Sequence, residues 1–488
     1  MRYTATCLLI LGQLICTAGC ATFKANPWPQ IVPSSDAVEV PESTWSMSVD
    51  ASLSRAKTDR RPVLIYWGAD WCPPCNTLKS AVFEHPKFSE DTEGWVKIYI
   101  DGDSANAQKW GEGFKIVNYP TVLMLNAAGT EIIRFHETAS YEEFSRRLHY
   151  TEQSTESFTQ LIQKALGGEA TESDWKVLVQ GARDHYQAEG LYDELLIDKL
   201  VPILERCPRL DTIPCNALEY AIIAASFETA SHDETALNAL QTIAWLDTWA
   251  RLVEAPERAN HYASYFHWVP RNLISRLELF EAPERIATQL PALMKTFHDI
   301  FVDPTIPLAQ RHNSGLALYQ LSKAVFPDRP PQELWIQSWF NLLTENTDLS
   351  SKRLLIPTLA KILAREGRDH EIEPLVNQFL SDDPTAWYHF YKLARSAVKR
   401  EEYDVALTLL QKTWNRATGR SSVLQVVSRS ATLLLKFPEP YRCDNLAHIQ
   451  ERWTDVLKDF SMPLHNRDKA AFDLFESTIE EASCHTSQ

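Results

Sequence analysis

The order of short apolar and amphipathic segments in residues 62–150 constrains the fold of this chain more than any other feature. Four apolar runs have the length and composition of buried strands, and segments with helical spacing separate the first three. A capping box at Ser140–Glu143 marks the start of another helix. The expected strands are residues 62–67, 95–101, 121–126 and 130–135, and the expected helices are residues 76–83, 106–114 and a final one from about residue 140. This order predicts an α/β domain with a mixed sheet flanked by helices.

Two cysteines follow the first expected strand, in the stretch Trp71-Cys72-Pro73-Pro74-Cys75. Cysteines at this spacing can form a disulfide only in a tight turn or in the first turn of a helix. At a helix N-terminus, backbone N–H groups and the helix dipole favour the thiolate form of the first cysteine. We therefore predict that Cys72 is the nucleophile that attacks a partner's disulfide and that Cys75 resolves the mixed disulfide.

The Trp-Cys-x-x-Cys motif, its position after a strand, and the sequence Tyr119-Pro120-Thr121 before the third strand together resemble the thioredoxin superfamily. The resemblance covers about residues 44–150, and the segments GADWCPPC, FEHPKF and NAAGTEI are most similar to exported thioredoxin-like domains. It implies that Pro120 follows a cis peptide bond, so that the backbone around Tyr119 can pair with an incoming extended chain. It also implies that Trp71 shields the reactive sulfur.

One position departs from the thioredoxin pattern. In thioredoxin, a buried aspartate six residues before the first cysteine helps to deprotonate the second cysteine, and here Tyr66 occupies that position. The family's lysine on the next strand has a counterpart in Lys97, but its acidic partner is missing. We expect Tyr66 to fill the core, and the proton of Cys75 to leave through water or another group such as Asp70 or Lys97.

The two prolines between the cysteines bear on the direction of electron transfer. Pro73 and Pro74 fit the start of a helix, but they remove two N–H groups that could stabilise the Cys72 thiolate. A less stabilised thiolate makes the pair more reducing than a strong oxidant. The sequence therefore predicts a protein-disulfide reductase, whose reactive pair other polypeptides must reach. The alternative is a binding scaffold in which the thioredoxin-like domain serves mainly for recognition.

The N-terminus predicts export. Residues 1–20 combine a basic start, an apolar run too short to cross a bilayer, and small residues before Cys20. The last four resemble a bacterial lipobox, with Thr17 where leucine is usual, and the alternative is an ordinary signal peptide cut near Ala18. Lipidation of Cys20 would anchor the protein to a membrane. Ala21 after the cysteine resembles Gram-negative lipoproteins of the outer membrane, which implies a periplasm-facing protein.

Export leaves six cysteines apart from Cys7, Cys16 and Cys20, and an even number in an oxidising compartment suggests pairs. The chain has no second Cys-x-x-Cys and Asn76 stands where haem attachment requires histidine, so neither zinc nor haem is expected. The redox-active pair needs no further cofactor. Other pairings stay open, but the economical set is a redox pair Cys72–Cys75 and two structural bridges, Cys207–Cys215 and Cys443–Cys484.

The remaining organisation follows from composition and pattern. Proline-rich residues 21–43 predict an extended tether, and residues 151–488 lose the strand pattern and predict a large all-α domain. Residues 387–418 resemble one degenerate tetratricopeptide unit of two antiparallel helices, so a solenoid-like array is expected and a plain helical bundle remains the alternative. Such an array offers concave surfaces, and we expect it to recruit a client or partner.

Charge limits the partners. The chain has a net charge of −16 and a pI near 5.4, which argues against nucleic acid as a partner. The expected partners are proteins with disulfides, an upstream electron donor such as a transmembrane thiol carrier, and the membrane through the lipid on Cys20.

Overall fold

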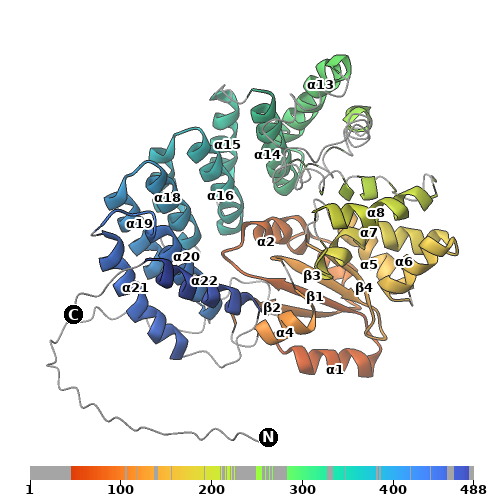
Figure 1. The fold of residues 1–488 in the computed structure, drawn as a ribbon. Coiled ribbons are helices and arrows are strands. Elements are labelled where there is room, and N and C mark those ends of the chain that lie inside the picture. The colour runs from red at the N-terminus through yellow and green to blue at the C-terminus, as the bar shows by residue number, and fades with distance from the viewer. Residues whose placement is uncertain are drawn as a thin grey trace, which may run out of the picture.

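A computed structural model describes residues 45–482 with gaps, of which the longest are 226–248 and 267–282. The predicted signal segment, the predicted lipidation site Cys20, the predicted tether and Cys484 lie outside the described residues, so the structure does not bear on them. Figure 1 shows a small sheet with helices on either side of it.

The sheet has four strands in the order β2-β1-β3-β4. Strand β1 pairs in parallel with β2 and antiparallel with β3, and β4 pairs antiparallel with β3, so the sheet is mixed as predicted. Every boundary lies within one residue of its prediction. The strands are β1 (Val63–Gly68), β2 (Val96–Asp101), β3 (Thr121–Leu125) and β4 (Glu131–Phe135).

Both faces of the sheet are buried, which explains why the strands are continuous apolar runs. On one face, Val63, Ile65 and Trp67 share a hydrophobic cluster with helices α1 (Val49–Asp59) and α4 (Ala107–Gly113). On the other face, Leu64 and Tyr66 share a larger cluster with α5 and the helices that follow it. Alternate side chains of β1 therefore pack into two separate hydrophobic cores.

Short helices connect the strands. Helix α2 begins at the cysteine motif and runs directly into a π-helical turn, η1. Helix α1, before the first strand, was not predicted from the sequence. The helices are α1 (Val49–Asp59), α2 (Pro73–Leu78), η1 (Lys79–Phe83), α3 (Phe88–Asp91), α4 (Ala107–Gly113) and α5 (Tyr141–Gln153).

The core of the sheet continues past the expected domain boundary at residue 150. Helix α5 ends at Gln153, and α6 (Phe158–Gly167), α7 (Glu172–Ala188) and α8 (Asp193–Arg206) pack in the same hydrophobic cluster. The predicted Cys207–Cys215 disulfide follows α8 and is buried in that cluster. The point at which the thioredoxin-like unit ends therefore stays a prediction.

The rest of the described chain is helical, as predicted. Consecutive helices pack against each other, and the tetratricopeptide-like segment forms the pair α18 and α19, with Phe390, Ala394, Ala406 and Leu410 fully buried. The helices are α13 (Pro283–Val302), α14 (Leu308–Val325), α15 (Glu333–Glu345), α16 (Leu349–Arg365), η3 (Asp369–Glu371), α17 (Ile372–Leu380), α18 (Trp387–Lys399), α19 (Tyr403–Arg416), α20 (Arg420–Leu434), α21 (Tyr441–Lys458) and α22 (Asn466–Ala482).

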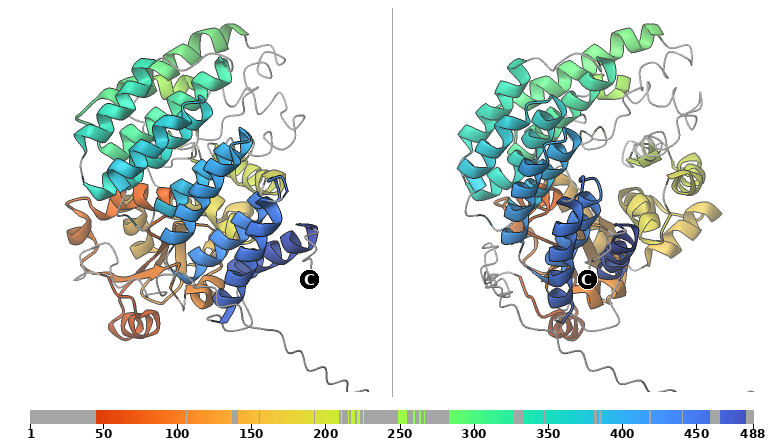
Figure 2. Two further views of the ribbon diagram at one scale, coloured as in Figure 1. Left: turned by 90° about the vertical axis from the view of Figure 1, so that its left-hand side faces the viewer. Right: turned by 60° about the vertical axis from the view of Figure 1, so that its left-hand side comes forward.

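Helices α13–α22 follow one another in an arc, which we call the helical arc (Figure 2). The arc returns to the α/β part: α16 packs on α2, α14 on η1, and α22 on α4. The arc therefore lies against the end of the sheet at which the cysteine motif sits (Figure 1). Among the described helices, none combines the length and the apolar composition needed to cross a bilayer.

Candidate functional site

Cys72 and Cys75 form the predicted disulfide in the first turn of α2, with their Cα atoms 5.2 Å apart. Cys72 is the N-cap residue of this helix, and its Sγ accepts a hydrogen bond of 3.2 Å from the backbone N–H of Cys75. Pro73 and Pro74 occupy the first helical positions and carry no N–H. The amide of Cys75 is therefore the first one of the helix that can stabilise charge on the Cys72 sulfur.

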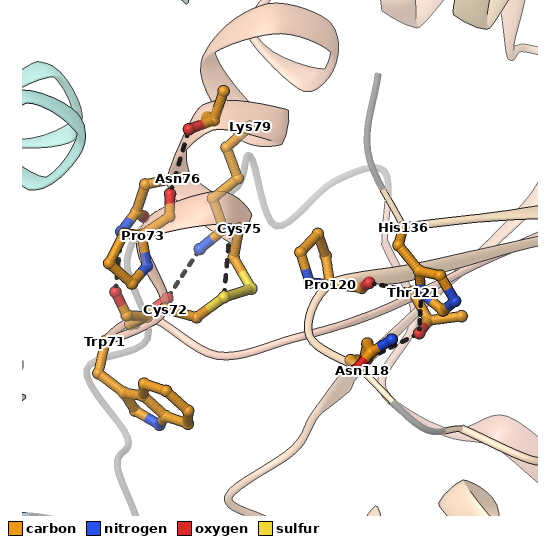
Figure 3. The surroundings of a disulfide bond; sticks show 12 residues. Trp71, Cys72, Pro73, Cys75, Asn76, Lys79, Asn118, Pro120, Thr121 and His136 are labelled. Carbon is orange, nitrogen blue, oxygen red and sulfur yellow. Dashed lines mark hydrogen bonds and ion pairs between the residues drawn. A yellow bond between two sulfur atoms is a disulfide. The ribbon is translucent and has the colours of Figure 1, made fainter. Parts of the chain in front are cut away.

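The peptide bond between Tyr119 and Pro120 is cis, as the resemblance implied. Figure 3 shows Pro120 across from the disulfide, with Thr121 and His136 behind it. The hydroxyl of Thr121 donates to the carbonyl of Asn118 at 2.8 Å. These contacts hold the loop that would face an incoming polypeptide.

His136 supports the same loop and was missed in the sequence analysis. Its Nδ1 lies 3.1 Å from the carbonyl oxygen of Pro120 and 3.0 Å from Oγ1 of Thr121. Burial lowers the pKa of His136, so the ring is neutral and its Nδ1–H can donate to the Pro120 carbonyl. No pattern in the sequence distinguishes this histidine, because it only follows the last strand.

Tyr119 connects the loop to the tryptophans of the site. Its ring centroid lies 5.6 Å from that of Trp71 and 5.6 Å from that of Trp67. The ring also lies against the backbone of Gly102, where a Cβ atom would be 2.0 Å from the tyrosine oxygen. Gly102 is thus required for this position of Tyr119.

Charged groups surround the start of α2. Asp70, which the sequence analysis had considered for proton transfer, forms an ion pair of 2.7 Å with the buried Lys79. Asp101 lies at the end of β2 beside Gly68, and it accepts a hydrogen bond of 3.0 Å from the N–H of Asp103. Burial, and next the charge of Asp103, raise the pKa of Asp101 to about 7. The sequence analysis missed Lys79, Asp101 and Asp103.

Tyr66 and Lys97 occupy positions that fit a core. Tyr66 stacks on Tyr99 with ring centroids 5.2 Å apart, and burial raises the pKa of Tyr66 well above its usual value. The ammonium of Lys97 donates to Oγ1 of Thr92 at 3.0 Å and lies over the ring of Phe88. Lys97 is in the first half of β2, whereas the strand end nearest the cysteine motif carries Asp101. The described contacts of Lys97 therefore involve Thr92 and Phe88 rather than the cysteines.

The helical arc covers the reactive pair. The ring of Trp71 lies 5.4 Å from that of Trp387 and 6.0 Å from that of Tyr388, both at the start of α18. Cys72 is 2% exposed and Cys75 is 0% exposed. The sequence analysis expected a pair that other polypeptides can reach, and in this arrangement of the chain they cannot reach it.

A comparison with protein families agrees with the geometry of the motif. Residues 44–127 match the model of a thioredoxin-like family. No curated protein matches the chain. The matched segment contains the cysteine pair and the cis proline, and we call it the thioredoxin-like domain. The helical arc lies outside the match.

The described residues contain no group of three or more His, Cys, Asp or Glu side chains arranged to hold a metal ion. The chemistry that this site can support with its own residues is thiol–disulfide exchange at Cys72 and Cys75.

Proposed function

We propose that this protein is an exported thiol–disulfide oxidoreductase that acts as a protein-disulfide reductase. The observation that supports it most is the Cys72–Cys75 disulfide in the first turn of α2, across from the cis Pro120 (Figure 3). This juxtaposition places a bond that can be opened next to a backbone that can pair with an extended chain.

The reaction balances without a cofactor. In the reduced protein, the Cys72 thiolate attacks one sulfur of a client disulfide and forms a mixed disulfide, and the other client sulfur leaves as a thiolate that takes up a proton. The Cys75 thiol then loses its proton and attacks Cys72. The client leaves as a dithiol and the Cys72–Cys75 bond forms. An upstream donor, such as a transmembrane thiol carrier, must return two electrons and two protons to the pair.

The surroundings of Cys72 favour the reducing direction. Pro73 and Pro74 provide no N–H group, which leaves the 3.2 Å hydrogen bond from Cys75 as the stabilising contact from this turn. The carboxylate of Asp103 lies beside Trp71, next to Cys72, and negative charge there disfavours a thiolate. A poorly stabilised thiolate makes the oxidised pair the favoured state and the dithiol a better reductant.

Reduction of insulin by the pre-reduced protein tests the activity. The wild-type protein should reduce insulin, and Cys72→Ser should abolish the reaction. Cys75→Ser should accumulate disulfide-linked clients in the cell envelope, which identifies the substrates. Equal turbidity curves for the wild type and Cys72→Ser would contradict the proposal.

The anchoring is a separate part of the proposal. A lipid on Cys20 would hold the protein on the periplasmic face of the outer membrane, at the end of the tether. Incorporation of labelled palmitate into the wild type but not into Cys20→Ser would support this, and release of an unlabelled mature protein would contradict it.

A recognition scaffold is the second candidate, because the burial of Cys72 and Cys75 favours it. In that case the helical arc would bind a partner and the disulfide would only stabilise α2. The two candidates differ in the redox potential of the pair. A pair that equilibrates with glutathione or dithiothreitol buffers supports the reductase, whereas a pair that never opens supports the scaffold.

A further inference from the structure

Trp71 lies between the thioredoxin-like domain and the helical arc. On one side its ring contacts Tyr119, and on the other side it contacts Trp387 and Tyr388. Trp387 is 2% exposed and packs in the main core of the arc. The aromatic pair at the start of α18 thus occupies the surface of Trp71 that a client would otherwise approach.

Beside these ring contacts, the carboxylate of Asp103 also links the two parts of the chain. Oδ2 of Asp103 accepts a hydrogen bond of 2.8 Å from the indole of Trp71 and one of 2.6 Å from the hydroxyl of Ser422. Ser422 is in the first turn of α20, where the helix dipole favours a nearby negative charge. Gly419 precedes this helix, and a Cβ atom there would lie 2.8 Å from Cβ of Asp103. The close approach of α20 to the site therefore depends on a glycine.

A buried ion pair lies near the start of α18. Arg353 on α16 forms two hydrogen bonds of 2.7 and 2.8 Å with Asp383, and both side chains are buried. Asp383 lies just before α18, and α16 itself packs on α2. Helices α16, α18 and α20 therefore contact the cysteine motif as one packed unit.

We propose that Trp387 and Tyr388 control access to Cys72, so that disulfide exchange requires α18 and α20 to separate from Trp71. This inference rests on the proposed function and adds its regulation. Exchange needs the incoming sulfur to approach along the axis of the S–S bond, and a residue with 2% exposure leaves no such path for a polypeptide. The rate then equals the intrinsic rate multiplied by the fraction of molecules that are open. Clients that displace the arc from Trp71 are thus reduced fastest, whereas an unselected disulfide such as that of insulin is reduced only by the fraction of molecules that are open.

The rate at which dithiothreitol reduces the Cys72–Cys75 bond tests this. In the reaction, one thiolate of the reagent attacks Cys72, and Cys75 leaves and takes up a proton. The second thiol of the reagent then loses its proton and attacks the mixed disulfide, which closes the reagent's ring disulfide and releases Cys72 to take up a proton. Samples are quenched with a maleimide carrying polyethylene glycol, and the gel shift reports the freed thiols. The Cys207–Cys215 bridge in the same molecules is the internal reference.

Trp387→Ala and Tyr388→Ala should each accelerate reduction of the pair by about ten-fold or more, because they remove the contacts with Trp71. Ser422→Ala removes one hydrogen bond to Asp103 at little risk to folding, and it should accelerate the reaction by a smaller factor of about three. Tyr403→Ala is the matched control, because this aromatic residue packs on Phe437 within the arc, away from Trp71. It should leave the rate unchanged.

The outcomes separate the two proposals. Equal rates for the wild type, Ser422→Ala and the α18 variants would overturn the access control, even if all of them reduce insulin. A variant that reacts rapidly with dithiothreitol but transfers no electrons to insulin would overturn the reductase and leave the access control intact. If Trp387→Ala does not fold, Tyr388→Ala and Ser422→Ala still decide the question.

Discussion

The position of Tyr119 in the site depends on the absence of a Cβ atom at Gly102. A Cβ atom at this position would lie 2.0 Å from the oxygen of Tyr119 and 2.4 Å from its Cζ, so the ring would have to move. Tyr119 precedes Pro120 and contacts Trp71. The absence of a side chain at Gly102 therefore determines the position of the Tyr119 ring beside the cysteine motif.

We expect Gly102→Ala to lower kcat/KM for insulin reduction by about ten-fold, because the displaced Tyr119 moves the loop that receives the client. The redox potential of the cysteine pair should change little, since the three atoms nearest to a Cβ atom at Gly102 all belong to Tyr119. Gly113→Ala is the control, because a Cβ atom there meets nothing within 4 Å. Unchanged kinetics for Gly102→Ala would show that the position of Tyr119 is unimportant for clients.

Asp101 makes stability depend on pH. Its pKa is raised to about 7 by burial and the charge of Asp103, whereas an unfolded aspartate has a pKa of about 3.9. The folded chain therefore holds this proton to higher pH than the unfolded chain does. The stability that the protonated group contributes is full below pH 4 and is lost as the pH rises to about 7.

Asp101→Asn should therefore be more stable than the wild type at pH 8, by about 1 kcal/mol or more, and the difference should shrink towards pH 4. The asparagine oxygen can still accept the hydrogen bond from the N–H of Asp103. Urea unfolding of both proteins at several pH values measures this. A difference that is the same at every pH would mean that the carboxyl is not perturbed.

An ion pair of unusual burial lies within the hydrophobic core of the helical arc. The side chains of Arg353 and Asp383 are 6% and 1% exposed, and their hydrogen bonds join α16 to the segment between α17 and α18. Removal of one member of a buried pair leaves a charge without its partner, which costs more than the pair itself contributes.

Arg353→Met should lower the free energy of unfolding by about 3 kcal/mol, and adding Asp383→Leu should recover much of the loss. Because α16 and α18 lie over the motif, Arg353→Met should also accelerate reduction of the Cys72–Cys75 bond. Denaturant unfolding and the dithiothreitol assay measure the two effects. A double variant as unstable as the single one would show that packing, and not the unpaired charge, dominates.

The elements of the sheet could be predicted, because each strand is buried on both faces and its apolar run is bounded by turn residues. Cys72, Cys75 and the cis Pro120 could also be located, because their motif is local. Lys79 and His136 carry no such signal, because Lys79 acts through Asp70, and His136 through the Pro120 carbonyl and Thr121. Helix α1 could not be recognised because only a few of its residues, such as Val49 and Ala56, are buried.

At the scale of the molecule, the contacts over the site lay beyond sequence reasoning. Ser422 and Asp103 are 319 positions apart, and nothing local in either segment indicates that they meet. The sequence therefore predicted a solenoid-like helical array but not where that array packs. In the structure it packs over the cysteine motif. Cys72 itself is buried in a small cluster with Trp71 and Tyr119, and the arc packs on Trp71.

The continuous core across residue 150 gives a prediction about fragments. Phe135 and Phe144 belong to the same cluster as Phe158 and Trp175 of α6 and α7, and a fragment that ends at residue 150 would also cut α5. We expect residues 44–216 to fold cooperatively and residues 44–150 to be unfolded or to aggregate. Circular dichroism melting of both fragments measures this. A stable, monomeric 44–150 fragment would place the end of the domain where the sequence analysis expected it.

The two hydrogen bonds that Asp103 accepts offer a way to follow the movement of α20 by tryptophan fluorescence. Because the indole of Trp71 and the first turn of α20 share one acceptor oxygen, α20 cannot leave without changing the surroundings of that ring. A movement of α20 therefore changes the environment of Trp71, a fluorescent side chain next to Cys72. The emission wavelength of Trp71 would shift as water reaches its ring, so opening of the arc could be followed without an added label.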